Sequence, residues 1–280
     1  MRILFIGGGN MATALIGGLL QQGFKPGDLR AVEVAEEARR RLQQHFGVSA
    51  IAALDGEIAE DVVLLAVKPQ QMRVVAKALR ASLRGQLVIS IAAGIRTADL
   101  ARWLGGHPRI VRVMPNTPAL IRSGVSGMFA AAAVNQADRD SAQSILGAVG
   151  GVVWVQNEPD IDVVTAVSGS GPAYIFYFIE ALEQAAVDLG LNDAQAHQLA
   201  VQTFVGAAKL AAGSDDPAAV LRARVTSKAG TTEAALKSME ASGIKRKIVE
   251  AVHAAARRSR EIGDEFGKDQ ATKTDQAAKK

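Results

Sequence analysis

A glycine-rich run lies close to the start of the chain. The run Gly7-Gly8-Gly9-Asn10-Met11-Ala12 matches the pattern G-x-G-x-x-A and directly follows the apolar segment Ile3–Ile6. In this pattern the first glycine permits a tight turn, the second lets the backbone approach a pyrophosphate, and the small last residue lets helix and strand pack closely. Unpaired N–H groups at the start of the following helix stabilise the negative charge. The run predicts a dinucleotide-binding turn; the alternative is a tight strand–helix turn without a ligand.

An acidic residue is expected about 20 residues beyond such a run, where it binds the ribose hydroxyls of the adenosine. Glu33 stands at that place, at the end of the next apolar run. If Glu33 faces the ribose, its carboxylate repels a 2′-phosphate and favours NAD over NADP. The alternative is a solvated glutamate at a strand end, and the sequence leaves both open. For Arg39, Arg40 and Arg41, which follow in a helical pattern, a solvated helix face is expected.

Three further loops follow apolar runs: Ala66-Val67-Lys68-Pro69, Ser90–Gly94 and Met114–Pro118. In an open parallel sheet, ligands bind beyond the carboxyl ends of the strands. The small residues let a flat ring approach the backbone, Lys68 can donate to a ribose or phosphate, and Asn116 can hydrogen-bond to a ligand. Each residue alone has a structural alternative, because prolines end strands and Asn-Thr-Pro forms turns.

Two later runs combine small residues with hydroxyl groups at expected helix starts. They are Ser168-Gly169-Ser170-Gly171-Pro172 and Gly230-Thr231-Thr232. Backbone N–H groups at a helix start lack partners, which suits a substrate carboxylate at the second run. The first run can lie close to a cofactor ring, and the hydroxyls of Ser170 and Thr232 can orient a proton or a water. Two ordinary capped helix starts are the alternative.

The elements that must position these groups differ between the two halves of the chain. In the first half, short apolar runs alternate with helical patterns, which predicts βαβ units and a mostly parallel sheet. The runs lack polar alternation, as expected for strands covered on both faces. The predicted strands are Ile3–Ile6, Leu29–Val34, Val62–Val67, Leu87–Ile91 and Ile110–Met114, with Gly127–Ala131 and Val152–Val155 as further edge strands, and the predicted helices are Met11–Leu20 and Glu36–Phe46.

From Asn157 onward no strand is predicted. The helix expected over Pro172–Leu189 is apolar on every side in its first turns, and such a helix is buried. In so small a helical domain this indicates burial against a second subunit. Other helices are expected from Asn192 or Asp193 to Ala212, from Asp216-Pro217, from Thr231 or Thr232, and over Ile244–Ile262. The predicted fold is an α/β Rossmann-type domain with a mostly parallel sheet at 1–156, an all-α substrate and dimerisation domain at 157–265, and a disordered tail at 266–280.

The composition argues against several classes of protein. The 280 residues include no cysteine, which excludes disulfides and thiolate chemistry, and no His/Asp/Glu cluster has the spacing of metal ligands. The net charge of +4 is spread along the chain and only 4% of residues are aromatic, which argues against nucleic-acid binding. No signal peptide or membrane span is expected. We expect a cytoplasmic protein without a metal.

Taken together, the motifs resemble those of the pyrroline-5-carboxylate reductases. The resemblance extends from Met1 to about Arg260. The last two motifs are specific to the family, whereas the glycine run is shared by many dehydrogenases. The motifs are Phe5–Ala12, Ala66–Pro69, Val113–Pro118, Ser168–Tyr174 and Val225–Thr232.

The resemblance implies reduction of 1-pyrroline-5-carboxylate to L-proline, the last step of proline biosynthesis, with NADP or NAD as the cofactor (NADPH or NADH). It also implies a Rossmann domain and a helical domain with helices interlocked between subunits, in a homodimer or, for some members, a homodecamer. The expected substrate contacts are Glu158, Gly230, Thr231 and Thr232, and Thr232 and Ser170 are the catalytic candidates. The expected cofactor contacts are Ile6, Gly7, Gly9, Asn10, Met11, Glu33, Ala66, Val67, Lys68, Pro69, Ala92, Ala93 and Asn116.

Two departures from the family's pattern matter. Some relatives carry small or polar residues suited to a 2′-phosphate at the position of Glu33, so NADP preference does not carry over to this chain. The signature loop often has the sequence Ser-Pro-Gly-Gly, where this chain has Ser227-Lys228-Ala229-Gly230. Lys228 either attracts the substrate carboxylate or faces solvent.

Hydride transfer to a carbon–nitrogen double bond needs a protonated or hydrogen-bonded nitrogen. None of the four histidines, His45, His107, His197 and His253, lies in a motif loop. We therefore expect positioning to supply most of the catalysis, with the cofactor carrying the chemistry and the proton donor left open. Two alternatives are a hydroxyacid dehydrogenase of the same architecture, which would use a helical-domain lysine although no matching motif surrounds Lys209, and a dinucleotide-binding regulator without catalysis.

Overall fold

The computed structural model describes residues 1–54 and 56–268. Contacts between residues divide the chain into two compact units. The sheet unit contains Met1–Ser170 and the C-terminal segment that begins at Ala255, and the helical unit contains Gly171–Ala254. No helix in the described part of the chain has the length and apolar character needed to cross a membrane.

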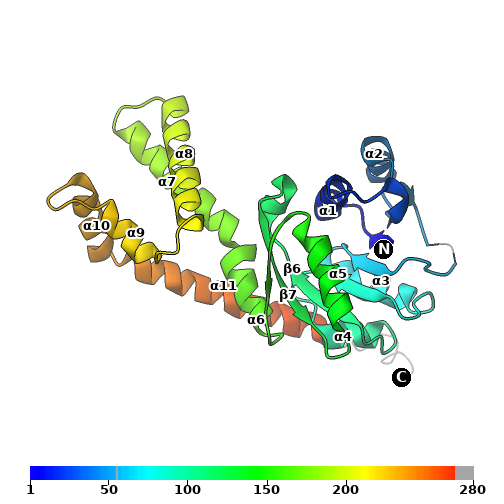
Figure 1. Cartoon of the computed structure of the whole chain (residues 1–280). Coiled ribbons are helices and arrows are strands. Elements are labelled where there is room, and N and C mark those ends of the chain that lie inside the picture. The colour runs from blue at the N-terminus through cyan, green and yellow to red at the C-terminus, as the bar shows by residue number, and fades with distance from the viewer. Residues whose placement is uncertain (55, 269–280) are drawn as a thin grey trace, which may run out of the picture. The chain divides into compact units, whose positions relative to one another are not determined.

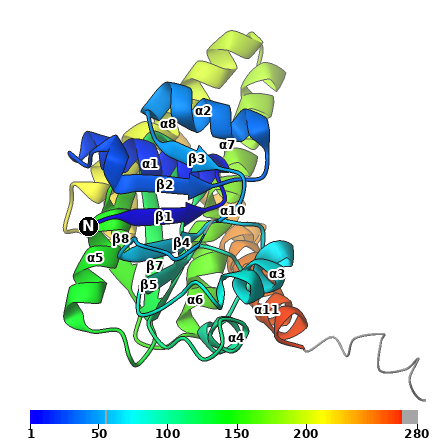
Figure 2. The ribbon, with the colours of Figure 1, turned by 90° about the vertical axis from the view of Figure 1, so that its right-hand side faces the viewer.

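The sheet unit is built on a single sheet with the strand order β3-β2-β1-β4-β5-β6-β7-β8. Figure 2 shows β3, β2 and β1 side by side. Neighbouring strands are parallel except β6 and β7, which confirms the mostly parallel sheet. Strand β1 pairs with β2 on one side and with β4 on the other, so the strand order reverses there, which is where such sheets bind ligands. The strands are β1 (Ile3–Ile6), β2 (Leu29–Val32), β3 (Ser49–Ile51), β4 (Val62–Leu65), β5 (Leu87–Ser90), β6 (Ile110–Met114), β7 (Gly124–Ala130) and β8 (Gly150–Trp154).

Alternate residues of β1 enter two different hydrophobic cores. Ile3 and Phe5 belong to one core, and Leu4 and Ile6 belong to the other. Because side chains alternate across a strand, both faces of the sheet are covered, which explains the unbroken apolar run in the sequence. Helices α1 (Asn10–Gln21), α2 (Glu36–Phe46) and α5 (Gln136–Gly147) line the first core, and α3 (Pro69–Leu79) and α4 (Thr97–Trp103) line the second.

Some predicted elements needed correction. Strands β7 and β8 were both expected as edge strands, but β7 lies between β6 and β8, and of these two only β8 is at an edge. Strand β7 also begins at Gly124, earlier than the predicted Gly127, because its first residues pair with Gly150 and Gly151 of β8. Strands β2 and β4 end two residues before their predicted ends at Val34 and Val67, because the apolar pattern continues into the loops that follow.

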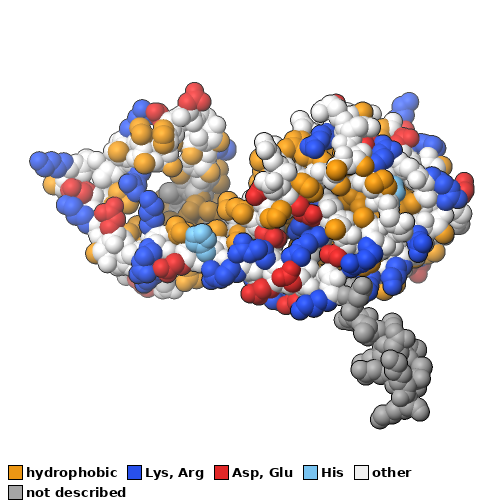
Figure 3. Space-filling model, turned by 90° about the horizontal axis from the view of Figure 1, so that it is seen from below, with side chains coloured by type: hydrophobic (Ala, Val, Ile, Leu, Met, Phe, Trp, Pro, Cys, Tyr) orange, Lys and Arg blue, Asp and Glu red, His pale blue; other side chains and the backbone are white. Residues whose placement is uncertain are grey.

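The helical unit contains no strand among its described residues, as predicted. Helices α7 and α8 form an antiparallel hairpin (Figure 1). Asn192 is the N-cap of α8 and forms a capping box, in which its side-chain oxygen accepts from the Gln195 N–H at 3.0 Å. Figure 3 shows hydrophobic side chains exposed on the helical unit, at the left of the view. Its helices are α7 (Gly171–Asp188), α8 (Asp193–Ala212), α9 (Ala218–Arg224), α10 (Thr231–Ala241) and the first part of α11 (Ile244–Gly267).

The contacts divide the chain after residue 170 and again after residue 254, whereas we predicted domains at 1–156 and 157–265. The difference arises because α6 (Asp160–Val164) contacts β6 and β7, and because the end of α11 packs on the sheet unit. The predicted domain boundaries stay a prediction. Helix α11 continues to Gly267, past the predicted end at Ile262, and residues 269–280 of the predicted tail lie outside the described residues.

Candidate active site

The glycine run forms the turn between β1 and α1. Gly7 has a φ of 100°, and a Cβ there would lie 2.8 Å from the carbonyl oxygen of Ala66, so only glycine fits. Gly9 is the N-cap of α1 and has no side-chain cap, and a Cβ built on it meets nothing within 4 Å. Ala12 is fully buried against the sheet. The helix start is thus open at Gly9, which suits a pyrophosphate held by backbone N–H groups.

Glu33 follows β2 directly and is partly buried. One of its carboxylate oxygens accepts from the Gly8 N–H at 2.7 Å, and the other accepts from the Ala35 N–H at 2.8 Å. The side chain is therefore held over the glycine run and is not a loosely solvated strand-end glutamate. Contact with a ribose stays a prediction.

The other predicted cofactor loops also gather at the carboxyl ends of the strands. Ala66 donates its N–H to the carbonyl of Ile6 at 2.8 Å, so the loop after β4 lies beside the glycine run. Lys68 is the exposed N-cap of α3, and Ala92 and Ala93 follow β5. Ala92 is buried in the second core, whereas Ala93 is only partly buried. Cofactor contacts by these residues stay predictions.

Asn116 ties two segments of the sheet unit together. Its side-chain oxygen accepts from the Val125 N–H at 2.9 Å, and its side-chain amide donates to the carbonyl of Ser168 at 3.2 Å. The amide thus has a structural role in joining β7 to the segment before α7. A cofactor contact by Asn116 stays a prediction.

The run Ser168–Pro172 is not a simple helix start. Thr165–Gly169 forms a π-helix that continues from α6, and α7 begins only at Gly171. The Ser170 N–H donates to the carbonyl of Thr165 at 2.8 Å and closes this π-turn. A Cβ on Gly169 would lie 2.6 Å from the side chain of Met114, so the turn packs tightly on the end of β6. Single π-turns often occur at functional sites.

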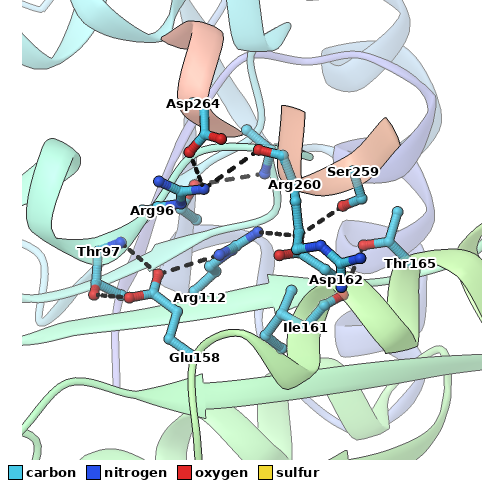
Figure 4. A network of polar contacts seen from close by, with 12 residues as sticks. Arg96, Thr97, Arg112, Glu158, Ile161, Asp162, Thr165, Ser259, Arg260 and Asp264 are labelled. Atoms are coloured by element: carbon cyan, nitrogen blue, oxygen red, sulfur yellow. Dashed lines mark hydrogen bonds and ion pairs between the residues drawn. The ribbon is translucent and has the colours of Figure 1, made fainter. Parts of the chain in front are cut away.

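Glu158 belongs to a buried polar network (Figure 4). Its carboxylate accepts from the N–H and the hydroxyl of Thr97, both at 2.7 Å, and from Arg112 Nη1 at 3.3 Å. Arg112 is 3% exposed and also pairs with Asp162, at 3.5 Å, and Asp162 accepts from the Ser259 hydroxyl at 2.7 Å. The buried arginine thus has two carboxylate partners, as a buried charge requires. Glu158 stays a predicted substrate contact, but its carboxylate already has three protein donors.

Sequence reasoning missed Arg112, Thr97, Asp162 and Ser259. One signal was available, because Arg112 interrupts the otherwise apolar strand Ile110–Met114. A charged residue inside a buried strand needs a partner of opposite charge. The sequence does not say which of the many acidic residues supplies it.

The run Gly230-Thr231-Thr232 lies in the helical unit, at the start of α10 as predicted. Gly230 is the N-cap and has no side-chain cap, and a Cβ on it would collide with the hydroxyl of Ser227. Ala229 has a φ of 59°, a left-handed conformation that favours glycine, and its N–H donates to Glu233 at 2.6 Å. The helix start therefore offers backbone donors to a carboxylate.

Known proteins match the chain over most of its length. Residues 158–262 match the model for pyrroline-5-carboxylate reductase dimerisation, and residues 2–94 match the model for NADP oxidoreductase, coenzyme F420-dependent. A pyrroline-5-carboxylate reductase of Pseudomonas aeruginosa is 46% identical over 268 residues, covering 95% of this chain and 98% of the relative. The chain belongs to the pyrroline-5-carboxylate reductase family.

Solved pyrroline-5-carboxylate reductases share the fold. That of Coxiella burnetii has a TM-score of 0.88 at 40% identity and covers 93% of this chain and 98% of its own. The pyrroline carboxylate reductase of Plasmodium falciparum, solved with NADP bound, has a TM-score of 0.82 at 29% identity and covers 94% of this chain and 98% of its own. The chain is therefore an NAD(P)H-dependent oxidoreductase of this family, with a C-terminal dimerisation domain that makes it a homo-oligomer. These relatives favour the reductase over the hydroxyacid dehydrogenase and the regulator.

The histidines lie outside the motif loops of this pyrroline-5-carboxylate reductase, as the sequence indicated. His45, His197 and His253 are exposed. His107 is buried, and its Nε2 lies 2.8 Å from the carbonyl of Gln86, at the end of the sheet remote from the glycine run. Burial lowers the pKa of His107 below 6.5, so the ring is neutral at pH 7. In the described part of the chain, no group of three or more His, Asp or Glu residues is arranged to hold a metal.

Proposed function

We propose that this chain reduces 1-pyrroline-5-carboxylate to L-proline, the last step of proline biosynthesis. The observation that carries the proposal is that one chain holds both an open glycine turn at the start of α1 and an uncapped α10 start led by Gly230-Thr231-Thr232. The first suits a pyrophosphate and the second suits the substrate carboxylate. The identity to named reductases over nearly the whole length supports the same reaction.

The glycine turn and the loops beside it hold the cofactor. Gly7 sets the turn, Gly9 and Asn10 present the start of α1 to the pyrophosphate, and Lys68 donates to a ribose or phosphate. Ala92 and Ala93 leave room for a flat ring. When bound, NADH or NADPH supplies the hydride that reduces the imine carbon.

The start of α10 binds and orients the substrate. Backbone N–H groups after Gly230 donate to the carboxylate, and the hydroxyls of Thr231 and Thr232 add donors. Binding in this way restricts the carbon–nitrogen double bond of the substrate to a small range of orientations toward the hydride donor. This restriction supplies a large part of the catalysis. Glu158 is a further proposed substrate contact.

The substrate nitrogen must carry a proton when the hydride arrives. Thr232 and Ser170 are the groups proposed to orient that proton or a water beside it. Neither hydroxyl ionises near neutral pH, so neither is a general acid. Substrate that binds already protonated at nitrogen needs only a hydrogen-bond acceptor, and a hydroxyl oxygen serves that role.

We further propose that the enzyme is a cytoplasmic homodimer, with assembly of dimers into a homodecamer as the larger alternative. Helix α7 supports the dimer, because none of its side chains is buried within its own chain although most are apolar. Light scattering after gel filtration distinguishes the dimer from the decamer by mass.

The test is the initial rate of NADH and NADPH oxidation with 1-pyrroline-5-carboxylate. Rapid turnover with either cofactor supports the proposal, whereas cofactor binding without turnover contradicts it. Thr232→Ala should lower turnover by about 10- to 100-fold, the effect of losing one positioned hydrogen bond. Ser238→Ala, which removes an exposed hydroxyl from the same helix, is the matched control and should change nothing. An unchanged rate in Thr232→Ala would remove Thr232 from the mechanism.

A further inference from the structure

The adenosine end of the predicted cofactor site is occupied by one carboxylate. The Glu33 side chain lies directly against the glycine run, since a Cβ on Gly8 would meet Glu33 Cβ and Cγ at 3.2 Å. Its two oxygens accept from the N–H groups of Gly8 and Ala35, at 2.7 and 2.8 Å. Ala35 is the N-cap of α2, so one donor comes from the glycine run and the other from the start of a second helix.

These two N–H groups could bind an anion, and in this protein they bind the Glu33 carboxylate. Backbone N–H groups at a turn and at a helix start are the donors that a phosphate uses. A 2′-phosphate on the adenosine ribose would need such donors and would meet the Glu33 carboxylate in their place. The negative charges of the 2′-phosphate and the Glu33 carboxylate would repel each other. The hydrogen bonds to Glu33 hold its carboxylate in position, so it would not move away easily.

Two of the three arginines that follow, Arg39 and Arg40, already have partners within the protein, whereas Arg41 is exposed. Arg39 Nη1 donates to the carbonyls of Glu33 and Val34, both at 2.8 Å, and Arg40 pairs with Glu36 at 2.5 Å. The Glu33 carboxylate therefore sets the charge beside the glycine run and favours a neutral ribose over a phosphorylated one.

A ribose 2′-hydroxyl fits the same carboxylate. An ionised carboxylate has about four acceptor positions on its two oxygens, and the backbone N–H groups use two of them. The remaining lone pairs can accept from a hydroxyl donor, which a 2′-phosphate lacks when fully ionised. The same group thus accepts one cofactor and rejects the other.

We propose that Glu33 acts as a built-in substitute for a 2′-phosphate and makes this reductase select NADH over NADPH. The inference rests on the proposed cofactor site and adds to it the residue that sets the choice. Removing the carboxylate opens both N–H groups and leaves Arg39 beside them. The variant Glu33→Ser should therefore gain affinity for the phosphorylated cofactor while losing affinity for the other.

The test is the dissociation constant of NADH and of NADPH, measured by nucleotide fluorescence in the full-length protein without substrate. The wild-type protein should bind NADH on the order of tenfold more tightly or better, the effect of one charge-assisted hydrogen bond. Glu33→Ser should shift the ratio of the two constants toward NADPH by at least a similar factor. Glu37→Gln removes a carboxylate from the exposed first turn of α2 and should leave the ratio within about twofold.

Three further measurements distinguish a specific role of Glu33 from misfolding of the variants and from failure of the proposed function. Glu33→Asp keeps the charge and should keep the NADH preference, and thermal unfolding shows whether each variant is folded. Adenosine 2′,5′-bisphosphate and 5′-AMP report on the ribose position alone, and Glu33→Ser should favour the bisphosphate. Equal wild-type affinity for the two cofactors, or an unchanged ratio in folded Glu33→Ser, overturns the inference while turnover with pyrroline-5-carboxylate leaves the proposed function standing. Binding of neither cofactor overturns both.

Discussion

The sheet unit and the helical unit bury their apolar residues in different ways. In the sheet unit, Leu4 and Phe5 have no exposed surface, and both faces of the sheet are covered by helices of the same chain. In the helical unit, α7 has no buried residue, and Phe176 and Tyr177 are 60% and 71% exposed. Apolar side chains of this size are costly to leave in water. One unit completes its core within one chain, whereas the other leaves apolar side chains exposed, which we propose a second copy covers.

The largest effect should come from opening the core of the sheet unit. Phe5→Ala removes a fully buried ring of β1 from the first core and should lower the free energy of unfolding by about 3–5 kcal/mol. Urea denaturation followed by circular dichroism measures this loss. The loss should not depend on protein concentration, and a loss under about 1 kcal/mol would show that the core can repack around the gap.

A charge on α7 should instead act through the second copy. Phe176→Glu should weaken the dimer by about 2–4 kcal/mol, or roughly 30- to 700-fold in its dissociation constant, because a carboxylate replaces a buried interface ring. Sedimentation equilibrium measures the constant. Val74→Glu is the control, since Val74 of α3 is 73% exposed in the sheet unit and should leave the dimer intact. An equal effect of both changes would remove the distinction between the units.

A smaller effect should be the loss of stability at acidic pH caused by His107 of the sheet unit, which His253 of the helical unit should not cause. Burial lowers the pKa of His107 in the sheet unit, so the unfolded chain binds more protons than the folded chain at mildly acidic pH. The stabilisation by the neutral ring is present above pH 6.5, and it is lost as the pH falls through the lowered pKa of the folded state. The change is at most about 1.4 kcal/mol per pH unit. Urea denaturation at pH 7.5 and 5.5 should show this loss in the wild-type protein and less of it in His107→Gln, whereas His253→Gln, at an exposed position, should match the wild type.

The smallest effect concerns the loop before α10. Ala229→Gly should stabilise the helical unit by about 0.5–1 kcal/mol, because glycine adopts the observed φ of 59° without strain. Ala235→Gly, at an exposed position inside α10, should destabilise it by a similar amount. The two opposite shifts in melting temperature would show that the strain is local, and shifts of the same sign would contradict this.

The sequence predicted the elements with strong local patterns and missed those that depend on distant contacts. The glycine turn, α2, α10 and the apolar strands of the first half follow from spacing alone. Helices α3, α4 and α5 were not predicted, although Met72, Trp103 and Leu146 complete the two cores. Each of these helices has only a short apolar stripe among many polar residues, so the helical spacing was not recognised in the sequence. Strand β3 has only three residues and no alternation to detect.

Site prediction shows the same limit. The position of Glu33 followed from counting along the chain, but its contacts with Gly8 and Ala35 depend on how the loop after β2 returns to the glycine run. The pairing of Arg112 with Glu158 joins residues that lie far apart in the sequence. Without a fold, no rule of spacing connects them.

Helix α11 gives the chain a particular order of events during its synthesis. The strands and the residues Asp162 and Arg96 leave the ribosome long before Ser259 and Asp264, which hydrogen-bond to them. A nascent chain can assemble the sheet early, because domains generally begin to fold from the N-terminus as they emerge. Asp162 and Arg96 lack their partners Ser259 and Asp264 until α11 has emerged. Emergence of α11, rather than closure of the sheet, is therefore the step that completes this half of the enzyme.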